Sequence, residues 1–308
     1  MSKSEQPIPN VLFKYRGDSE LTEKIIRNQQ VWLSTPAQLN DPLECKIAEI
    51  PKVWKAKTIR KMEQAQIMGL VAPNLSGELP KQFFSLSERE TKQWLKRFKK
   101  LTHSRKVKAM RALYSDHGIQ LSKPENVFKD MHERLSSIGV FSLSEDRCNE
   151  LMWAHYGDNH EGLAFGFKSV NGCKMADPRH CLKVTYASEK PIFKSGFQSE
   201  VNIMASGSGE SNVQRVSFED EVFRSAISTK TPAWKYEKEW RYVEETHGLF
   251  DFPGLLSQTV FGMRMGEERK NYYKDLISKT TASDVEFYEI VESSNLSGLG
   301  IRKIDCAL

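Results

Sequence analysis

The 308-residue sequence has few of the features that assign a chain to a common class. Its five cysteines are odd in number, widely spaced and without a Cys-x-x-Cys pair, which argues against a disulfide framework or a zinc knuckle and predicts free thiols. No apolar run approaches the roughly 20 residues of a membrane-spanning helix. The polar N-terminus has no hydrophobic signal-peptide stretch. We therefore expect a cytoplasmic protein without membrane contact.

Common nucleotide and hydrolase signatures are absent as well. The chain has no GxGxxG, GxxxxGK[ST], HExxH or GxSxG motif, which removes the simplest enzyme classes. With 39% hydrophobic and 28% charged residues, it has the composition of a soluble globular protein. Its net charge of +5 permits an anionic partner without requiring one.

Strand and helix patterns alternate irregularly along the chain, without the regular rhythm of a doubly wound sheet. Strands are expected at 11–16, 29–35, 139–146, 163–167, 182–188, 258–263, 285–292 and 299–305. Helices are expected at 19–28, with Leu21 and Ile25 on the buried side, and at 149–157, 217–229 and 267–278. The small polar residues of 205–213 predict a mobile loop.

Residues 52–135 differ from the rest, because they are rich in Lys, Glu, Gln and Leu. They predict several helices inserted into a β-containing core. The segment 93–114 is strongly basic, and a basic helix expected at 93–111 is a candidate nucleic-acid contact. The alternative is that these charges are simply a solvated helix face.

The stretch TPAWKYEKEWRYVEE (231–245) is the most unusual in the chain. Period-two alternation places Glu237, Glu239 and Arg241 on one face of a strand and the aromatic Trp240 and Tyr242 on the other. The three charges either form a surface ladder of little energetic value or line a site.

Other segments mix aromatic rings with a few polar groups, which suits a flat, hydroxyl-rich ligand such as a nucleotide. They are KYR (14–16), VWLSTP (31–36), FSLSE (141–145) and LMWAHYGDNHEG (151–162). The last segment carries His155 and His160 near two carboxylates. These histidines are five residues apart and do not share a helical face, so we predict no metal site.

The order KYR, LSTP, NDP, FS, MWAHY, HEG and W.YE.EWR resembles a bacterial family catalogued as domain of unknown function 2971. The matching segments run from about Leu12 to Val243. The family label implies no activity.

A weaker resemblance, to the ADP-ribosyltransferase superfamily, implies a chemistry. Its members have a basic residue on a first strand (Arg16), a Ser/Thr-bearing second strand (Ser34, with Ser142 as an alternative) and a late Glu-x-Glu pair (Glu237 and Glu239). The resemblance implies NAD as the substrate, Glu239 as the catalytic carboxylate and Glu237 as the group that orients the incoming nucleophile. It further implies cofactor-binding roles for Arg16, Tyr15, Ser34, Ser142, Trp153, His155 and Tyr156.

The expected fold is therefore α+β, an ADP-ribosyltransferase-like split β-sheet core in a single domain, 1–308. Core strands come from 11–50 and 137–305, and 51–136 is the helical insertion. The expected function is NAD-dependent ADP-ribosyl transfer or NAD hydrolysis, in a toxin or antiphage setting that the resemblance alone suggests. Two alternatives stay open: a non-catalytic module that binds a nucleotide or nucleic acid, and a metal-independent nuclease or phosphotransferase that uses Arg16, His155 and Glu239.

Overall fold

The computed structural model describes residues 7–71, 80–193, 197–206, 209–293 and 298–304. The chain divides into two compact units. Unit 1 comprises residues 1–46, 134–191 and 224–308, and unit 2 comprises residues 47–133 and 192–223. The predicted insertion overlaps most of unit 2, which also takes in a second, later segment. None of the helices in the described ranges combines the length and apolar character that a bilayer crossing requires.

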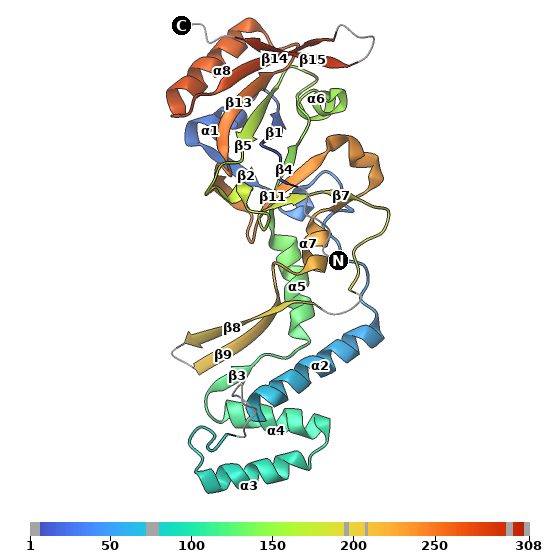
Figure 1. The fold of residues 1–308 in the computed structure, drawn as a ribbon, viewed down its shortest axis with the longest axis vertical. Coiled ribbons are helices and arrows are strands. Elements are labelled where there is room, and N and C mark those ends of the chain that lie inside the picture. Colours follow the sequence, from blue (N-terminus) through green and yellow to red (C-terminus); the bar gives the residue numbers. More distant parts are fainter. Residues whose placement is uncertain (1–6, 72–79, 194–196, 207–208, 294–297, 305–308) are drawn as a thin grey trace. The chain divides into compact units, whose positions relative to one another are not determined.

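Unit 1 is built on a mixed sheet, in agreement with the α+β prediction (Figure 1). Its eight strands are ordered β15 (Leu299–Ile304), β14 (Glu286–Glu292), β13 (Leu255–Phe261), β5 (Leu163–Lys168), β1 (Val11–Arg16), β4 (Gly139–Ser144), β11 (Glu239–Glu244) and β6 (Cys181–Lys183). Neighbouring strands are antiparallel except β13 and β14, which are parallel.

Helices pack on both faces of this sheet. On one face, α1 (Glu20–Asn28) and α8 (Glu267–Thr280) bury Ile26 and Tyr273 against strand residues such as Phe165. On the other face, α6 (Glu150–Tyr156) contributes Met152 and Trp153 to a smaller core. The sheet is therefore shielded on both sides, and a polar group within it is largely removed from water.

The first helix is where the predicted one lies, but its buried face is different. The Ser19 side chain caps α1 by accepting a hydrogen bond from the Thr22 N–H. Thr22 and Ile26 are buried, whereas Leu21 is 70% exposed, so the expectation for Leu21 was wrong. The buried side of α1 is therefore centred on Thr22 and Ile26, each one residue after the predicted Leu21 and Ile25.

Short elements complete unit 1. Two small pairings join β2 (Gln30–Leu33) to β12 (Gly248–Asp251) and β7 (Thr185–Tyr186) to β10 (Thr229–Lys230). The 3₁₀ helices are η1 (Pro36–Gln38), η2 (Lys174–Ala176) and η3 (Pro232–Glu237), and α7 spans Glu221–Ile227. The strand predicted at 182–188 is divided between β6 and β7, which belong to different sheets.

The elements that lie wholly or partly in unit 2 are α2 (Lys52–Val71), α3 (Glu88–Lys99), α4 (His103–Ser115), β3 (Ile119–Leu121), α5 (Asn126–Ser137), β8 (Ser199–Ser206), β9 (Gly209–Val216) and the start of α7. Two predictions were wrong here. Residues 205–213 belong largely to the β8–β9 hairpin rather than to a loop, apart from 207–208, which lie outside the described residues. The basic segment is two helices, because Thr102 begins α4 after a break.

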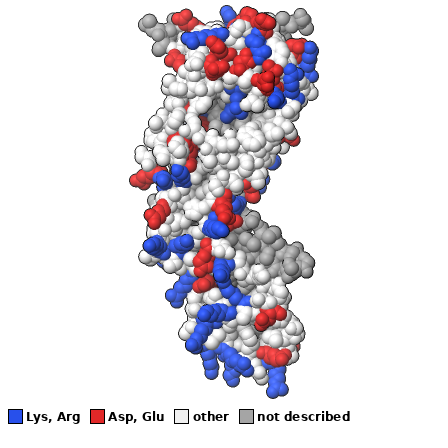
Figure 2. All heavy atoms as spheres, turned by 180° about the vertical axis from the view of Figure 1, so that it is seen from behind, with Lys and Arg blue, Asp and Glu red and all other residues white. Residues whose placement is uncertain are grey.

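The basic character of α3 and α4 is plain on the surface. Lys and Arg side chains gather over this end of unit 2 (Figure 2). Exposed members are Lys92, Lys96, Arg97, Lys99, Lys100, Arg105 and Lys108. A nucleic-acid contact at 93–111 stays a prediction.

Candidate functional site

The central sheet is split between β1 and β4. Strand β1 pairs with β5 at six register positions, and β4 pairs with β11 at six. Between β1 and β4 only the pair Phe13–Ser144 is formed. Farther along β4, the Val140 backbone exchanges hydrogen bonds of 2.8 and 2.9 Å with Ser34 instead. The two strands therefore diverge after one pair and expose their facing edges.

A cavity of about 220 Å³ opens at this split. Consecutive residues of β1 (Phe13 to Tyr15) and of β4 (Ser142 and Leu143) line it, as expected where two strand edges have separated. The remaining polar lining comes from distant segments: Ser34, Gln38, Asn40, Tyr156, Lys230, Glu237 and Glu239.

The turn before β11 brings the Glu-x-Glu pair to this cavity. Glu237 is the last residue of η3, and Glu239 is the first of β11. Lys238 between them has a left-handed backbone (φ 45°) and forms the turn from η3 into β11. The Ser144 hydroxyl donates to the Glu237 carbonyl (2.6 Å), and the Glu239 N–H donates to the Tyr186 hydroxyl (2.8 Å). These bonds hold the turn in place.

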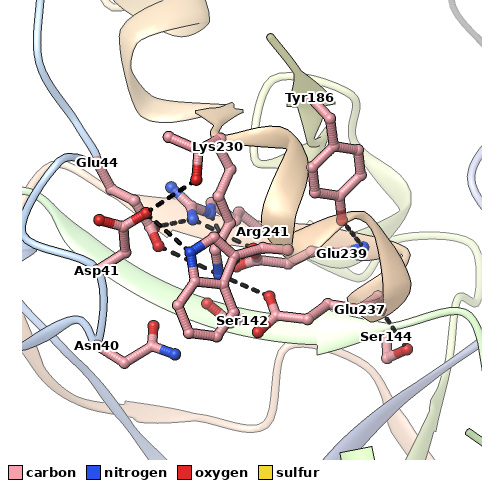
Figure 3. Close-up of polar contacts among 12 residues, drawn as sticks. Asn40, Asp41, Glu44, Ser142, Ser144, Tyr186, Lys230, Glu237, Glu239 and Arg241 are labelled. Carbon is pink, nitrogen blue, oxygen red and sulfur yellow. Dashed lines mark hydrogen bonds and ion pairs between the residues drawn. The ribbon is translucent and has the colours of Figure 1, made fainter. Parts of the chain in front are cut away.

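Arg241 anchors the cluster (Figure 3). Its side chain is fully buried, and its Nε donates to Glu239 Oε1 at 2.9 Å. Nη2 donates to Glu239 Oε2 at 3.2 Å and also to Glu44, while Nη1 donates to the Ile227 carbonyl at 2.6 Å and to the Cys45 thiol. A buried guanidinium needs this degree of satisfaction to offset its desolvation. Arg241 therefore fixes Glu239 in one orientation.

Lys230 is the second buried cation, and it bridges three carboxylates. Its Nζ lies 2.6 Å from Glu237, 3.2 Å from Glu239 and 3.1 Å from Glu44. It also lies 4.8 Å above the Trp234 ring. Three carboxylates face two permanent cations here, so the fully ionised cluster carries one net negative charge. The prediction that these charges form a surface ladder is excluded, because Glu237, Glu239 and Arg241 are all buried.

The environment pushes the pKa values of the two paired carboxyls in opposite directions. Burial favours the protonated form of Glu239, but Arg241 and Lys230 outweigh it and lower the pKa of Glu239 to about 2. Burial raises the pKa of Glu237, and the neighbouring Glu239 charge adds to the rise despite Lys230. Opposite shifts in an adjacent pair are typical of acid–base sites.

Glu237 also accepts a hydrogen bond from the Tyr156 hydroxyl. The two oxygens are 2.7 Å apart, and Asn40 in turn donates to the Tyr156 hydroxyl. Burial, followed by the Glu237 hydrogen bond and charge, raises the pKa of Tyr156. Tyr156 therefore stays a neutral donor to Glu237.

Lys14 is the second amine that lines the cavity, beside Lys230. Its Nζ donates to the Ser142 carbonyl at 3.0 Å, a backbone oxygen that has no ladder partner on β1 because the strands have diverged. Burial, with a further contribution from the Arg16 charge, lowers the pKa of Lys14 to about 7. Lys14 therefore differs from Lys230, whose three carboxylate neighbours overcome burial and raise its pKa.

The structure brings together six of the nine predicted site residues. Glu237, Glu239, Tyr15, Ser34, Ser142 and Tyr156 all line the cavity. The buried Tyr15 also donates its hydroxyl to the Asp146 carbonyl. Arg16, Trp153 and His155 do not line the cavity. The residues of the proposed nuclease set, Arg16, His155 and Glu239, are thus not assembled around it.

Two of the three outlying residues have other surroundings. Trp153 is fully buried, donates its Nε1–H to the Arg147 carbonyl (2.9 Å) and packs edge-on against Tyr15 at 5.0 Å. His155 is exposed and contacts the rings of Tyr156 and Tyr236. Within the described residues, no group of three or more His, Cys, Asp or Glu side chains could hold a metal ion.

Arg16 is the third outlying residue. No described carboxylate pairs with its guanidinium, and its buried Nε has no hydrogen-bond partner in the described chain. Burial lowers its pKa. This cation is therefore left available for an anion.

Sequence reasoning did not select Lys14, Glu44 or Lys230. Lys14 is the first residue of the noted segment KYR, Lys230 lies one residue before TPAWKYEKEWRYVEE, and Glu44 follows NDP closely. Proximity to those motifs is the only signal that could have found them.

The comparisons with known proteins cover part of this site. Residues 152–242 match the model of DUF2971, a protein family of unknown function. This stretch, less than a third of the chain, is similar to that family and contains Tyr156, Lys230, Glu237, Glu239 and Arg241. The β1 side of the cavity lies outside the match. No curated protein and no solved structure gives a significant match.

Proposed function

We propose that the cavity at the β1–β4 split is the active site of an enzyme that cleaves NAD and transfers its ADP-ribosyl group. The observation that carries the proposal is the adjacent pair Glu237 and Glu239, buried at the cavity with pKa values shifted in opposite directions. Such a pair provides one carboxylate that stays ionised and one, Glu237, whose raised pKa makes it the stronger base.

Glu239 is suited to stabilise positive charge. Breaking the bond between ribose and nicotinamide passes through an oxocarbenium-like state, which a nearby carboxylate stabilises. Glu239 remains ionised because its pKa is low, and Arg241 holds it rigidly. The net negative charge of the cluster also favours a substrate whose reacting ring is already cationic.

Glu237 and Arg16 supply the other functions. The raised pKa of Glu237 makes it the proton acceptor for an incoming hydroxyl or amine. Arg16 has no described carboxylate partner, and a guanidinium binds phosphate oxygens in a bidentate manner. Because Arg16 lies outside the cavity lining, it is the candidate contact for the pyrophosphate where NAD extends beyond the cavity.

The test is incubation of the purified protein with adenine-labelled NAD and separate pools of protein, DNA and RNA. Nicotinamide release and label transfer are followed together, and the labelled pool identifies the acceptor. Glu239→Gln should lower release by about 10² to 10⁴ while NAD still binds. The matched control is Asp18→Asn, which changes a carboxylate that also bonds an arginine but lies outside the cavity; its release rate should equal that of the wild type.

A non-catalytic module that binds a nucleotide is the second candidate. It is favoured by the engagement of both Glu239 oxygens by Arg241 and Lys230, an arrangement that also suits a purely structural ion network. NAD binding without nicotinamide release, in the wild type and in Glu239→Gln alike, would establish this candidate. If the protein neither releases nicotinamide nor binds NAD, both candidate functions are overturned.

A further inference from the structure

The strongest unassigned feature of the cavity is the Lys14 amine. It projects from β1 where the strand leaves β4, and its Nζ is placed by the Ser142 carbonyl at 3.0 Å and the Phe141 ring at 4.8 Å. Both contacts come from β4, so the amine spans the split. A side chain held by two rigid strands is well suited to position a reacting atom.

Lys14 and Lys230 line the same cavity but have different partners. Lys230 lies within 3.2 Å of three carboxylates. Lys14 forms no ion pair with any described residue, and the group that accepts its hydrogen bond is the neutral Ser142 carbonyl. A carbonyl accepts a hydrogen bond from a neutral amine as well as from an ammonium group, although the latter bond is stronger, so this contact does not require the charged form.

The charged groups around Lys14 oppose one another. Arg16 on the same strand and Lys230 on β10 repel its charge, whereas Glu237 and Glu239 attract it. Burial is the largest influence, and the pKa falls to about 7. At pH 7 roughly half of such amines are unprotonated, against less than about 0.1% for an ordinary lysine with a pKa of about 10.4.

We propose that Lys14 is a nucleophilic amine that forms an imine with the aldehyde of an open-chain pentose in this cavity. The carboxylates and hydroxyls around it are groups that bind sugar hydroxyls, and a volume of about 220 Å³ accommodates a five-carbon sugar. The inference concerns the cavity of the proposed function, but it requires no NAD cleavage.

The reaction balances without a redox partner. The Nζ lone pair adds to the aldehyde carbon, and the carbonyl oxygen becomes a hydroxyl after a proton moves from nitrogen to oxygen. Water then departs, and a C=N bond replaces the C=O bond. Glu237, whose pKa is raised, is the cavity group that can protonate the departing hydroxyl.

The test is reductive trapping on the wild-type protein. Ribose 5-phosphate is added with cyanoborohydride at several values between pH 6 and 9, and peptide mass spectrometry gives the modification rate of each lysine. Lys14 should react at least about tenfold faster at pH 7 than the exposed Lys24, with a midpoint near pH 7. Lys230, which also lines the cavity, should remain unmodified because its carboxylate neighbours keep it protonated.

Matched variants separate chemistry from structure. Lys14→Arg retains a donor for the Ser142 carbonyl but forms no imine, so trapping at this position should vanish without a loss of thermal stability. Lys24→Arg should leave trapping at Lys14 unchanged.

Equal labelling of Lys14 and Lys24, or a midpoint near pH 10, would overturn the proposal. If Lys14→Arg does not fold, the modification rates of the individual lysines in the wild-type protein are sufficient to test the proposal. Because no step uses NAD, a failure of NAD cleavage leaves this result intact, and the reverse also holds.

Discussion

Unit 1 contains two clusters in which one arginine bridges two carboxylates, and they differ mainly in burial. Arg241 joins Glu44 and Glu239, and its side chain is 0% exposed. Arg269 on α8 joins Asp18 and Glu23, and its side chain is 38% exposed. Both clusters also include hydroxyl donors, Tyr156 in the first and Tyr272 and Tyr273 in the second.

The same ionic chemistry thus serves two purposes. In the Arg269 cluster, water screens the charges, and the contacts join α1 to α8 at little energetic gain. In the Arg241 cluster, desolvation makes every unpaired charge costly, so the partners must remain together, and the two cations lower the pKa of Glu239 to about 2. Burial therefore distinguishes the Arg241 cluster, a candidate site, from the Arg269 cluster, a surface ion-pair network of similar composition.

The largest expected difference between the clusters is in stability. Arg241→Met leaves Glu44 and Glu239 buried with one cation fewer and should lower the unfolding free energy by about 3–5 kcal/mol. Arg269→Met should cost no more than about 1 kcal/mol, because its partners can turn to water. Urea denaturation of both variants checks this, and equal losses would contradict the comparison.

A smaller difference is expected in acid. Because the folded pKa of Glu239 is depressed to about 2, its stabilisation is complete above the unfolded pKa near 4.5 and is lost as pH falls toward 2. The stability gap between wild type and Glu239→Gln should be about 3 kcal/mol at pH 7 and about half of that at pH 3. Unfolding free energies measured across this range test the trend, with Asp18→Asn as the exposed control. A gap that is constant with pH would mean that Glu239 is not held ionised by its neighbours.

The smallest expected effect is that of salt. Raising NaCl from about 0.05 M to about 1 M should reduce the stability difference between wild type and Arg269→Met, because exposed charges are screened. The difference for Arg241→Met should change little, because its surroundings exclude ions. If both respond alike, the Arg241 cluster is more open to solvent than its burial indicates. Thermal denaturation at the two salt concentrations makes the comparison.

Much of the secondary structure could be predicted, because it depends on local patterns. The strands expected at 11–16 and 285–292 are β1 and β14, and the helix expected at 19–28 is α1. The errors have tertiary causes. The segment 205–213 has loop-like composition but is paired in a hairpin. Residues 182–188 are divided because their two halves pair with different strands, β11 and β10.

The candidate site was predictable only in part. Alternation places Glu239 and Arg241 on one face, and both are buried on β11. It could not indicate that Glu44 and Lys230, far apart in the sequence, complete the cluster. Nor could it indicate that Trp153 lies in the core rather than at the cavity, since aromatic residues serve both purposes.

By itself, the sequence determined the mixed α/β class, most of the strands and the placement of Glu239 and Arg241 on one strand face, because these follow from periodicity along a few neighbouring residues. Only the tertiary structure decided that β1 and β4 separate after one pair, that the charges are buried, and that Lys14 and Lys230 have opposite pKa shifts in one cavity. The physical reason is that a protonation state depends on desolvation and on charges from distant segments, and folding alone brings these within a few ångströms.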